Sequence, residues 1–334
     1  MKIAINGFGR IGRIFFRQAF GHKDVDIVAV NDLGDIQNLS YLLKYDSVYG
    51  RFNREVSVSG DEFMVDGKSI SFLQEKDPSK LPWGRLGVDV VVESTGFFTS
   101  YDKAKAHLDA GAKRVVISAP AKDGGETKTA TPNVGVDFLA EGPVTSNGSC
   151  TTNATTPVVA IMMKEPGIKK AMLSTVHGYT STQSLVDSPS TKDFRRGRAA
   201  AVNIIPASTG ASETTGRVIP GLKGKFEGIA LRVPVLSGSV IDFTFIAERK
   251  TSVEEINDIF KKAAASEEWR GILKVSEDAL VSSDVLGEPY GSIVDLSFTR
   301  VVDGDLVKIL SWYDNEFGYA AMLLKHVLYL KGLL

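Results

Sequence analysis

The chain contains one cysteine, Cys150, and the residues around it are polar. It lies in the sequence Ser-Asn-Gly-Ser-Cys-Thr-Thr-Asn, residues 146–153. Ser149 is a favourable N-cap residue, so we expect a helix to begin at Cys150, and the dipole of that helix would stabilise a thiolate. An isolated cysteine more often fills an apolar core, but these polar neighbours do not suit that role. Cys150 is therefore a candidate nucleophile.

His177 is the candidate partner of this thiol. It directly follows residues 170–176, a run that predicts a strand, so its ring would stand at a strand end. A thiol beside an imidazole suits covalent catalysis, in which the sulfur attacks an electrophilic carbon and the ring exchanges a proton. A protonated ring would also favour the thiolate. The other histidines, His22, His107 and His326, lie in charged or helical stretches where we expect solvated side chains, and no two are spaced as metal ligands.

A glycine-rich string near the start of the chain predicts a dinucleotide site. Gly7, Gly9 and Gly12 form a G-x-G-x-x-G pattern that follows an apolar run and opens a helical stretch. Asp32 comes 20 residues after Gly12, at the end of the next predicted strand. In such a motif the glycines let the backbone approach a pyrophosphate at the helix N-terminus, and the carboxylate binds the ribose hydroxyls. Because a carboxylate repels a 2′-phosphate, Asp32 favours NAD over NADP.

A basic run and a single arginine on a predicted strand suggest anion binding. The run Lys-Asp-Phe-Arg-Arg-Gly-Arg at residues 192–198 could contact nucleic acid, form a solvated loop, or place guanidiniums on phosphate groups. Arg232 stands in the otherwise apolar run 229–235, and a charge on a buried strand needs a partner. A bound phosphate group would supply such a partner.

The elements that must position these residues differ between the two parts of the chain. In the first third, apolar strands alternate with helical stretches, which is typical of a doubly wound parallel sheet covered on both faces. Residues 51–72 instead alternate polar and apolar side chains, which favours an antiparallel hairpin over 55–60 and 62–71. The predicted strands are 2–5, 25–31, 88–93 and 114–118, and the predicted helices are 9–20 and 101–110.

After about residue 150 the pattern indicates a mixed, largely antiparallel sheet. Residues 179–201 form a long polar loop, and loops of that length are usually functional. The expected strands are 170–176, 229–235, 239–247, 292–295 and 306–313, with helices at 210–218, 253–265 and 319–330. We therefore expect an α/β protein: a Rossmann-type doubly wound parallel sheet followed by an α+β catalytic domain. The expected bounds are 1–148 for NAD binding and 149–317 for catalysis, with a C-terminal helix at 318–334 returning to the first domain.

Composition narrows the class of protein. The chain has 334 residues, which predicts about two domains, and a formal net charge of -1. Hydrophobic residues make up 43% and charged residues 24%, which excludes wholesale disorder, and the near-zero charge argues against nucleic-acid binding by bulk positive charge. No signal peptide or membrane span is predicted. One cysteine cannot form an internal disulfide, and we expect a cytoplasmic protein.

Four stretches of the sequence resemble phosphorylating glyceraldehyde-3-phosphate dehydrogenases. They are Gly-Phe-Gly-Arg-Ile-Gly-Arg at 7–13, the cysteine segment at 146–153, Asn-Ile-Ile-Pro-Ala-Ser-Thr-Gly at 203–210 and Trp-Tyr-Asp-Asn-Glu at 312–316. The resemblance extends essentially from end to end, and the Cys-Thr-Thr-Asn block is specific. It implies NAD-dependent oxidative phosphorylation of D-glyceraldehyde 3-phosphate to 1,3-bisphosphoglycerate, a reversible step of glycolysis and gluconeogenesis, through a hemithioacetal and a thioester on the cysteine. It also implies a homotetramer.

The resemblance assigns roles to individual residues. It implies that Cys150 is the nucleophile and His177 its base, with no metal. Phosphate-binding roles are implied for Ser149, Thr151, Thr180, Arg195, Thr209, Gly210 and Arg232. Cofactor contacts are implied for Arg10, Ile11, Asp32, Lys76, Ser118 and Asn315, beside the glycines at 7, 9 and 12.

The sequence departs from the family pattern at several positions and leaves alternatives open. Ala154 replaces a common second cysteine, Phe317 replaces a common tryptophan, and Ala320 and Ala321 replace a common Ser-Asn pair, none of them at a catalytic position. Gly34 and Ser188 lie near positions that tune NAD against NADP, so NADP remains a weaker alternative cofactor. The alternative functions are erythrose-4-phosphate dehydrogenase and, from another class, a nucleic-acid or protein-binding module with a vestigial dinucleotide site.

Overall fold

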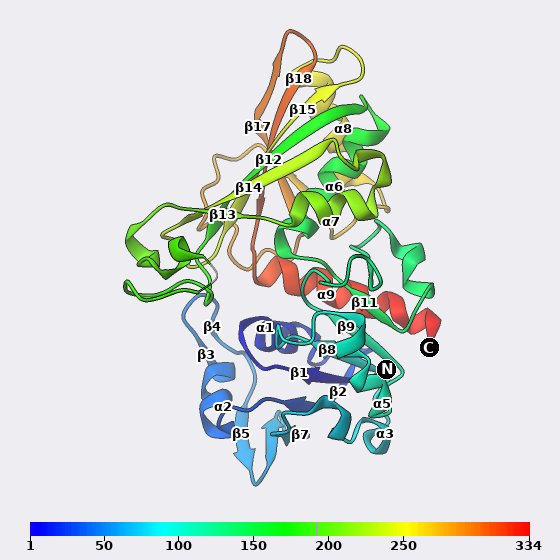
Figure 1. The fold of residues 1–334 in the computed structure, drawn as a ribbon, viewed down its shortest axis with the longest axis vertical. Coiled ribbons are helices and arrows are strands. Elements are labelled where there is room, and N and C mark those ends of the chain that lie inside the picture. Colours follow the sequence, from blue (N-terminus) through cyan, green and yellow to red (C-terminus); the bar gives the residue numbers. More distant parts are fainter. Residues whose placement is uncertain (192) are drawn as a thin grey trace. The chain divides into compact units, whose positions relative to one another are not determined.

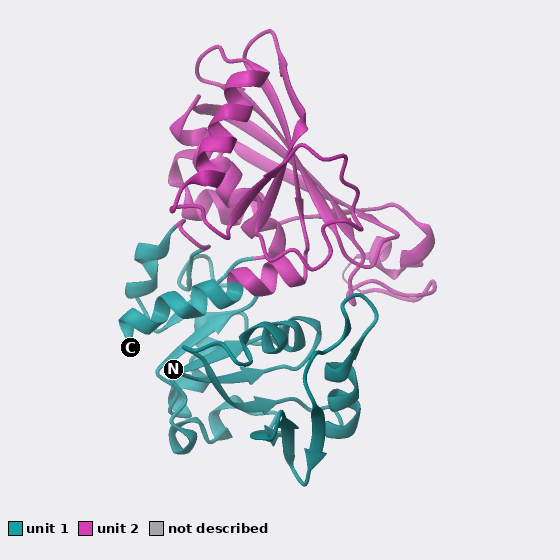
Figure 2. Cartoon of the chain, turned by 180° about the vertical axis from the view of Figure 1, so that it is seen from behind, with its two compact units in different colours: residues 1–130, 135–148, 323–334 teal, residues 131–134, 149–322 magenta. Residues whose placement is uncertain are grey.

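The computed structural model describes residues 1–191 and 193–334, which divide into two compact units (Figure 2). Unit 1 contains residues 1–130, 135–148 and 323–334, and unit 2 contains residues 131–134 and 149–322. Each unit has its own large sheet. The expected α/β class, with one parallel-dominated and one mixed sheet, is confirmed.

Unit 1 is built on a nine-stranded sheet in the order β10-β11-β9-β8-β1-β2-β7-β6-β5 (Figure 1). The strands from β10 to β7 in this order run parallel, and β6 and β5 add an antiparallel edge. The order reverses at β1, and the carboxyl ends of strands at such a switch point are where open α/β sheets bind ligands. The strands are β1 (Lys2–Asn6), β2 (Asp26–Asn31), β5 (Val56–Ser59), β6 (Glu62–Val65), β7 (Lys68–Leu73), β8 (Val90–Glu93), β9 (Arg114–Ile117), β10 (Lys128–Thr129) and β11 (Val144–Ser146).

The helices and turns of unit 1 differ from the sequence prediction in several places. The predicted helix at 101–110 is two short helices, α4 and α5, and the helices α2, α3, η1 and η2 were not expected. The predicted strand at 62–71 is two strands, because Asp66 and Gly67 both adopt positive φ values and turn the chain. The helices are α1 (Arg10–Ala19), α2 (Ile36–Lys44), α3 (Trp83–Leu86), α4 (Tyr101–Ala104), α5 (Ala106–Asp109), η1 (Pro78–Lys80) and η2 (Val136–Ala140), and a separate hairpin pairs β3 (Tyr45–Asp46) with β4 (Gly50–Arg51).

Unit 2 is built on a seven-stranded sheet in the order β13-β14-β12-β15-β18-β17-β16. Only the pairs β12–β14 and β16–β17 are parallel. The edge strands β13 and β16 were not predicted, and β17 continues beyond the expected segment at 292–295. The strands are β12 (Ile168–Gly178), β13 (Ile205–Ser208), β14 (Phe226–Val233), β15 (Ser239–Ala247), β16 (Leu273–Ser276), β17 (Ser292–Val302) and β18 (Leu306–Tyr313).

Three helices of unit 2, α6 (Cys150–Lys164), α7 (Ala211–Val218) and α8 (Val253–Ala265), cover one face of this sheet (Figure 1). Strand β15 alternates strictly between buried and half-buried side chains, as expected for a sheet with one covered face. On the uncovered face Met172, Ile229 and Leu306 are 58%, 50% and 41% exposed. The other helices are η3 (Phe194–Gly197), η4 (Ala200–Val202) and η5 (Pro220–Leu222), and α9 (Phe317–Tyr329) begins in unit 2 and ends in unit 1, followed by η6 (Leu330–Leu333).

Candidate active site

Cys150 is the first residue of helix α6, as the sequence predicted. The Ser149 side chain caps this helix by accepting a hydrogen bond of 3.0 Å from the backbone N–H of Thr152. The backbone N–H groups of Cys150 and Thr151 in the first turn act to lower the pKa of the thiol, because their partial positive charge favours a thiolate. Cys150 is partly accessible to solvent, which a nucleophile requires.

The strand register places the candidate base beside this thiol. His177 lies near the end of β12, and its Nε2 is 3.3 Å from Cys150 Sγ. In the parallel neighbour β14, Arg232 is the register partner of His177. The Arg232 Nη1 atom is 2.5 Å from His177 Nδ1 and 3.1 Å from the carbonyl oxygen of Gly178. The structure thus brings Cys150, His177 and Arg232 together from three separate elements.

Burial and charge set the protonation of these groups. Burial, with the Arg232 charge as a second cause, lowers the pKa of His177 to about 3. Burial also raises the pKa of the Cys150 thiol, and the Arg232 charge is the largest influence opposing that rise. The imidazolium expected from the sequence is therefore absent near neutral pH in the free chain, because a buried ring beside a guanidinium does not take up a proton. The cation that favours the thiolate is Arg232.

The neutral His177 ring has two tautomers, and they differ in which nitrogen can act as a base. His177 Nδ1 is 2.6 Å from the carbonyl oxygen of Gly178. When Nδ1 carries the proton and donates to this oxygen, Nε2 presents its lone pair to Cys150 and acts as a base. A guanidinium only donates, so the close contact from Arg232 belongs to the other tautomer. An anion that binds Arg232 would therefore favour the basic state of Nε2.

Tyr313 is a buried residue of the site that sequence reasoning missed. Its hydroxyl is 2.9 Å from Thr151 Oγ1 on α6 and 2.8 Å from Thr175 Oγ1 on β12. Its ring packs edge-on against His177, with centroids 6.0 Å apart. The tyrosine therefore links the elements that carry the thiol and the imidazole. Burial raises the pKa of Tyr313, so the hydroxyl stays protonated. Only the alternation of β18 hinted at this inward position.

The remaining predicted anion-binding residues lie on loops and helix starts of unit 2. Thr180 follows β12, and its hydroxyl is 2.9 Å from Thr182 Oγ1. Thr209 and the N-cap residue Gly210 open helix α7 directly after β13, and Ile205 of β13 is the register partner of Arg232. Arg195 lies in η3 with an exposed side chain. Residue 192 of the predicted basic run lies outside the described residues.

The predicted dinucleotide residues surround a pocket of about 490 Å³ at the carboxyl end of β1 in unit 1. Gly7, Gly9, Asp32 and Lys76 line it directly. A Cβ on Gly7 would lie 2.6 Å from the backbone nitrogen of Thr95, whereas a Cβ on Gly9 would meet open space. Gly7 is therefore required by close packing, and Gly9 leaves room for a ligand above the start of α1. This cradle fits a pyrophosphate.

Asp32 has a second role that the motif alone did not reveal. Its Oδ2 accepts a hydrogen bond of 2.6 Å from the backbone N–H of Phe8, and its Oδ1 accepts one of 2.8 Å from Gly34. The carboxylate thus holds the glycine-rich loop in place. Arg10, at the start of α1, forms an ion pair of 2.5 Å with Asp46.

Five predicted cofactor residues do not line this pocket. Arg10, Ile11 and Gly12 belong to α1. Ser118 follows β9, and its backbone N–H donates to the backbone carbonyl of Glu93. Asn315 belongs to unit 2, where Ser239 donates a hydrogen bond of 2.8 Å to its side-chain oxygen. Sequence reasoning missed two exposed apolar residues that line the pocket, Leu33 and Phe97, which are 60% and 75% exposed. Both come just after the carboxyl end of a sheet strand, and that position was the available signal.

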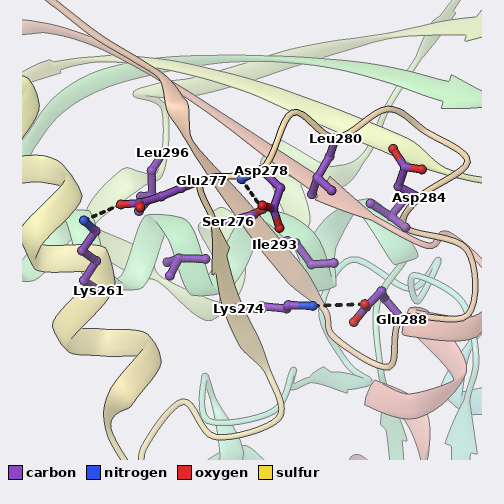
Figure 3. Close-up of a pocket in the computed structure, with 12 residues that line it drawn as sticks. Lys261, Lys274, Ser276, Glu277, Asp278, Leu280, Asp284, Glu288, Ile293 and Leu296 are labelled. Atoms are coloured by element: carbon purple, nitrogen blue, oxygen red, sulfur yellow. Dashed lines mark hydrogen bonds and ion pairs between the residues drawn. The ribbon is translucent and has the colours of Figure 1, made fainter.

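A second pocket, of about 470 Å³, lies in unit 2 and contains none of the predicted site residues (Figure 3). Both lysines of its lining form ion pairs, Lys261 with Glu277 at 2.5 Å and Lys274 with Glu288 at 3.1 Å. Within the described ranges, no His, Cys, Asp and Glu side chains are grouped as metal ligands. No helix in the same ranges is both long and apolar enough to cross a membrane.

Comparisons with known proteins agree with these two sites. A family model described as the NAD binding domain of glyceraldehyde 3-phosphate dehydrogenase matches residues 1–101, and the model of its C-terminal domain matches residues 149–315. Glyceraldehyde-3-phosphate dehydrogenase of Streptomyces coelicolor is 50% identical over 96% of this chain and 95% of its own length. The enzymes of Geobacillus stearothermophilus and Bacillus subtilis are 49% and 48% identical, each over 96% of this chain and 95% of their own lengths. The chain therefore belongs to the glyceraldehyde-3-phosphate dehydrogenase family of NAD-dependent enzymes.

Proposed function

We propose that Cys150 and His177 carry out the NAD-dependent oxidation and phosphorylation of D-glyceraldehyde 3-phosphate in this chain. The observation that supports this assignment most directly is the 3.3 Å contact between Cys150 Sγ and His177 Nε2 at the N-terminus of α6. The family assignment supplies the substrate and the cofactor, and the geometry supports the proposed roles. The proposed NAD-binding domain comprises residues 1–148 and a returning C-terminal helix at 318–334, and residues 149–317 form the proposed catalytic domain.

The proposed reaction has two stages. His177 Nε2 accepts the proton of the Cys150 thiol, the thiolate attacks the aldehyde carbon, and the ring returns the proton to the resulting alkoxide, which gives a hemithioacetal. His177 Nε2 then takes the proton of its hydroxyl group while a hydride leaves the same carbon, which yields a thioester. Bound NAD supplies the hydride acceptor. In the second stage an oxygen of inorganic phosphate attacks the thioester carbon, the C–S bond breaks, and Cys150 leaves as a thiolate from 1,3-bisphosphoglycerate.

Two phosphate groups must be held during this reaction, one on the substrate and one that attacks. We assign Arg232 and Thr180 to the side of His177, because Arg232 already lies against that ring. The start of α7, with its free backbone N–H groups, is a second anion-binding position. The full set proposed for phosphate is Ser149, Thr151, Thr180, Arg195, Thr209, Gly210 and Arg232.

The pocket of unit 1 is the proposed site of NAD. Its glycine loop would receive the pyrophosphate, Asp32 the ribose hydroxyls, and the exposed Leu33 and Phe97 the flat base. Arg10, Ile11, Gly12, Lys76, Ser118 and Asn315 complete the proposed contacts. Because Asp32 also anchors the loop, Asp32→Gly is expected to weaken NAD binding even where it relieves the repulsion of a 2′-phosphate.

The open face of unit 2 supports a proposal for how the chain assembles. An apolar sheet face of this kind suits contact with a second copy of the chain, and the family resemblance implies a homotetramer. We place the enzyme in the cytoplasm, where reducing conditions keep Cys150 a thiol.

The proposed reaction is tested by following NAD reduction with glyceraldehyde 3-phosphate. Turnover should be sustained with inorganic phosphate and fall to a small burst without it, because the thioester then accumulates. Cys150→Ser should abolish both, since a hydroxyl has almost no anionic form near neutral pH. Erythrose 4-phosphate, offered in parallel, should react more slowly. Faster turnover of the four-carbon substrate, or turnover independent of phosphate, would contradict the assignment.

A further inference from the structure

A buried carboxylate lies beneath the dinucleotide pocket. Glu93 is the last residue of β8, beside the switch-point strand β1, and is only 1% exposed. Its Oε1 accepts hydrogen bonds from the backbone N–H, at 2.8 Å, and the hydroxyl of Thr95. Its Oε2 is 2.5 Å from Asn6 Nδ2 and 3.0 Å from His107 Nε2. An isolated buried charge is strongly unfavourable, so this arrangement requires an explanation.

The direction of every hydrogen bond on one side of Glu93 is fixed by backbone groups. The side chain of Asn31 donates to the carbonyl of Glu75 and accepts from its N–H, both at 2.9 Å. Because these backbone groups cannot exchange roles, Asn31 Nδ2 also donates to Asn6 Oδ1, at 2.7 Å. The Asn6 amide group must then point its Nδ2 at Glu93.

On the His107 side of Glu93, the indole of Trp83 fixes the direction of the hydrogen bonds. Trp83 Nε1 is 3.0 Å from His107 Nδ1, and an indole N–H can only donate. His107 Nδ1 is therefore unprotonated, and its Nε2–H donates to Glu93. The ring is neutral and fully buried, contrary to the solvated side chain expected from the sequence. Asn6 Nδ2 and His107 Nε2, 3.3 Å apart, are two donors that share Oε2.

Glu93 thus receives only donors, and all of them are neutral, so the network requires the ionised carboxylate. Of the four donor groups, two belong to Thr95 and one belongs to Asn6. Both of these residues line the pocket. The Thr95 hydroxyl also accepts a hydrogen bond of 3.1 Å from the backbone N–H of Phe97, which carries the exposed ring in the pocket lining. A fully satisfied polar network of this kind rigidifies the groups that it joins.

We propose that Glu93 is a positioning residue for the cofactor, whose carboxylate fixes Asn6 and the turn at 94–97 at the base of the dinucleotide pocket. The inference rests on the proposed NAD site in unit 1. It assigns to Glu93 no contact with the ligand. The network preorganises the pocket, and preorganisation increases affinity by reducing the entropy lost on binding.

The variant Glu93→Gln tests this role. Its amide group would place two N–H donors against either Thr95 or the Asn6 and His107 pair, whichever way it turned. We expect KM for NAD to rise about tenfold to a hundredfold, the effect of losing a charge-assisted hydrogen bond. The Kd of ADP-ribose, which lacks the nicotinamide, should rise by a similar factor. KM for glyceraldehyde 3-phosphate at saturating NAD should change little, because its proposed contacts belong to unit 2.

Asp295→Asn is the matched control. Asp295 is also fully buried and accepts hydrogen bonds only from neutral groups, at 3.1 Å from Trp312 Nε1 and 2.6 Å from Ser297 Oγ, but it belongs to unit 2. This variant should lower Tm without raising KM for NAD. If Glu93→Gln lowered Tm in the same way and left KM for NAD within about twofold, its role would be structural only and the inference would be overturned.

Two further variants separate the possible failures. If Glu93→Gln does not fold, Thr95→Val decides, because it removes one donor to Glu93 and the acceptor for Phe97 with little change of volume. It should raise KM for NAD by about threefold to tenfold, the effect of one neutral hydrogen bond, and no change would overturn the inference. Unchanged NAD binding in Asp32→Gly would show instead that the proposed cofactor site is wrong.

Discussion

Arg232 contacts the candidate base directly, and this gives one residue two separable effects. Its charge favours the Cys150 thiolate, and its planar fork suits a bidentate grip on the substrate phosphate. The sequence suggested only the phosphate-binding role of Arg232, because nothing in the run 229–235 reveals that β14 places this guanidinium against His177. The register of β12 and β14, which pairs two residues 55 positions apart in the chain, decides it.

Substitution of Arg232 separates the two effects. Arg232→Ala should raise KM for glyceraldehyde 3-phosphate by about tenfold to over a hundredfold, since charge-assisted hydrogen bonds contribute roughly 1.5–3 kcal/mol. It should also slow alkylation of Cys150 by iodoacetamide, because the thiol pKa rises. Arg232→Lys keeps the charge but loses the fork, so KM should still rise while alkylation stays near the parent rate. Steady-state kinetics and single-exponential alkylation measure these changes. An equal loss of activity toward unphosphorylated glyceraldehyde would contradict the phosphate role.

His177→Asn tests the base. Without the imidazole Nε2 atom as a proton acceptor, kcat should fall by about 10²–10⁴, the usual contribution of a positioned general base. Alkylation of Cys150 should also slow, because no group 3.3 Å from the sulfur remains to accept its proton. KM for NAD, measured with the same variant, serves as the internal control and should change little. An unchanged alkylation rate would contradict the activating role of His177.

At the scale of elements, motifs anchored to a strand end or a helix start were predictable from sequence. Ser149 identified the start of α6, and the G-x-G-x-x-G string identified the turn from β1 to α1. Contacts that join distant segments were not predictable, because no local pattern encodes them. Tyr313 and Glu93 have their roles through partners on other strands or helices. His107 and His326 look solvated in the sequence, since burial of a polar ring depends on a partner that only the fold supplies.

The buried ring of His326 joins α9 to β11 within unit 1. Its Nε2 is 3.0 Å from Thr145 Oγ1, and its Nδ1 is 3.2 Å from Asn147 Oδ1. Burial lowers the pKa of His326 to about 4. Below pH 6.5 the unfolded chain binds a proton at this position that the folded chain excludes until about pH 4, so the free energy of unfolding should fall as the pH drops through that window.

The variant His326→Gln should therefore flatten the dependence of Tm on pH between 6.5 and 4. One group can contribute at most about 1.4 kcal/mol per pH unit in this window. His177 contributes in the same direction, down to about pH 3, and remains in the variant. His22→Gln, which removes a histidine at a partly exposed position, is the comparison variant. Calorimetry at pH 7, 5.5 and 4.5 measures the slope, and an unchanged slope in the His326 variant would rule out this ring as an acid-sensitive contact.

At the scale of the whole molecule, one face of the sheet in unit 2 is left uncovered by the described residues of that unit. Its register places Met172, Ile229 and Leu306 on the same side, opposite α6, α7 and α8. Such faces are characteristic of association, because burying them removes apolar surface from water at roughly 25 cal/mol per Å². The pattern of β12 and β14 predicted strands, but it did not say which side would lack helices, since that depends on where the connecting segments pack.

Association through this face predicts that Ile229→Lys weakens the homotetramer. A lysine at this half-exposed position would bring its ammonium into an apolar contact, where a desolvated charge without a partner is strongly unfavourable. Ala265→Lys is the matched control, because it adds the same side chain at the exposed end of α8, on the covered side of the sheet. Sedimentation equilibrium over a range of protein concentrations should give a tetramer for the parent and the control, and dimers or monomers for Ile229→Lys. If the parent chain is a monomer with full activity, the tetramer is wrong. If Ile229→Lys remains tetrameric, the contact lies on another surface.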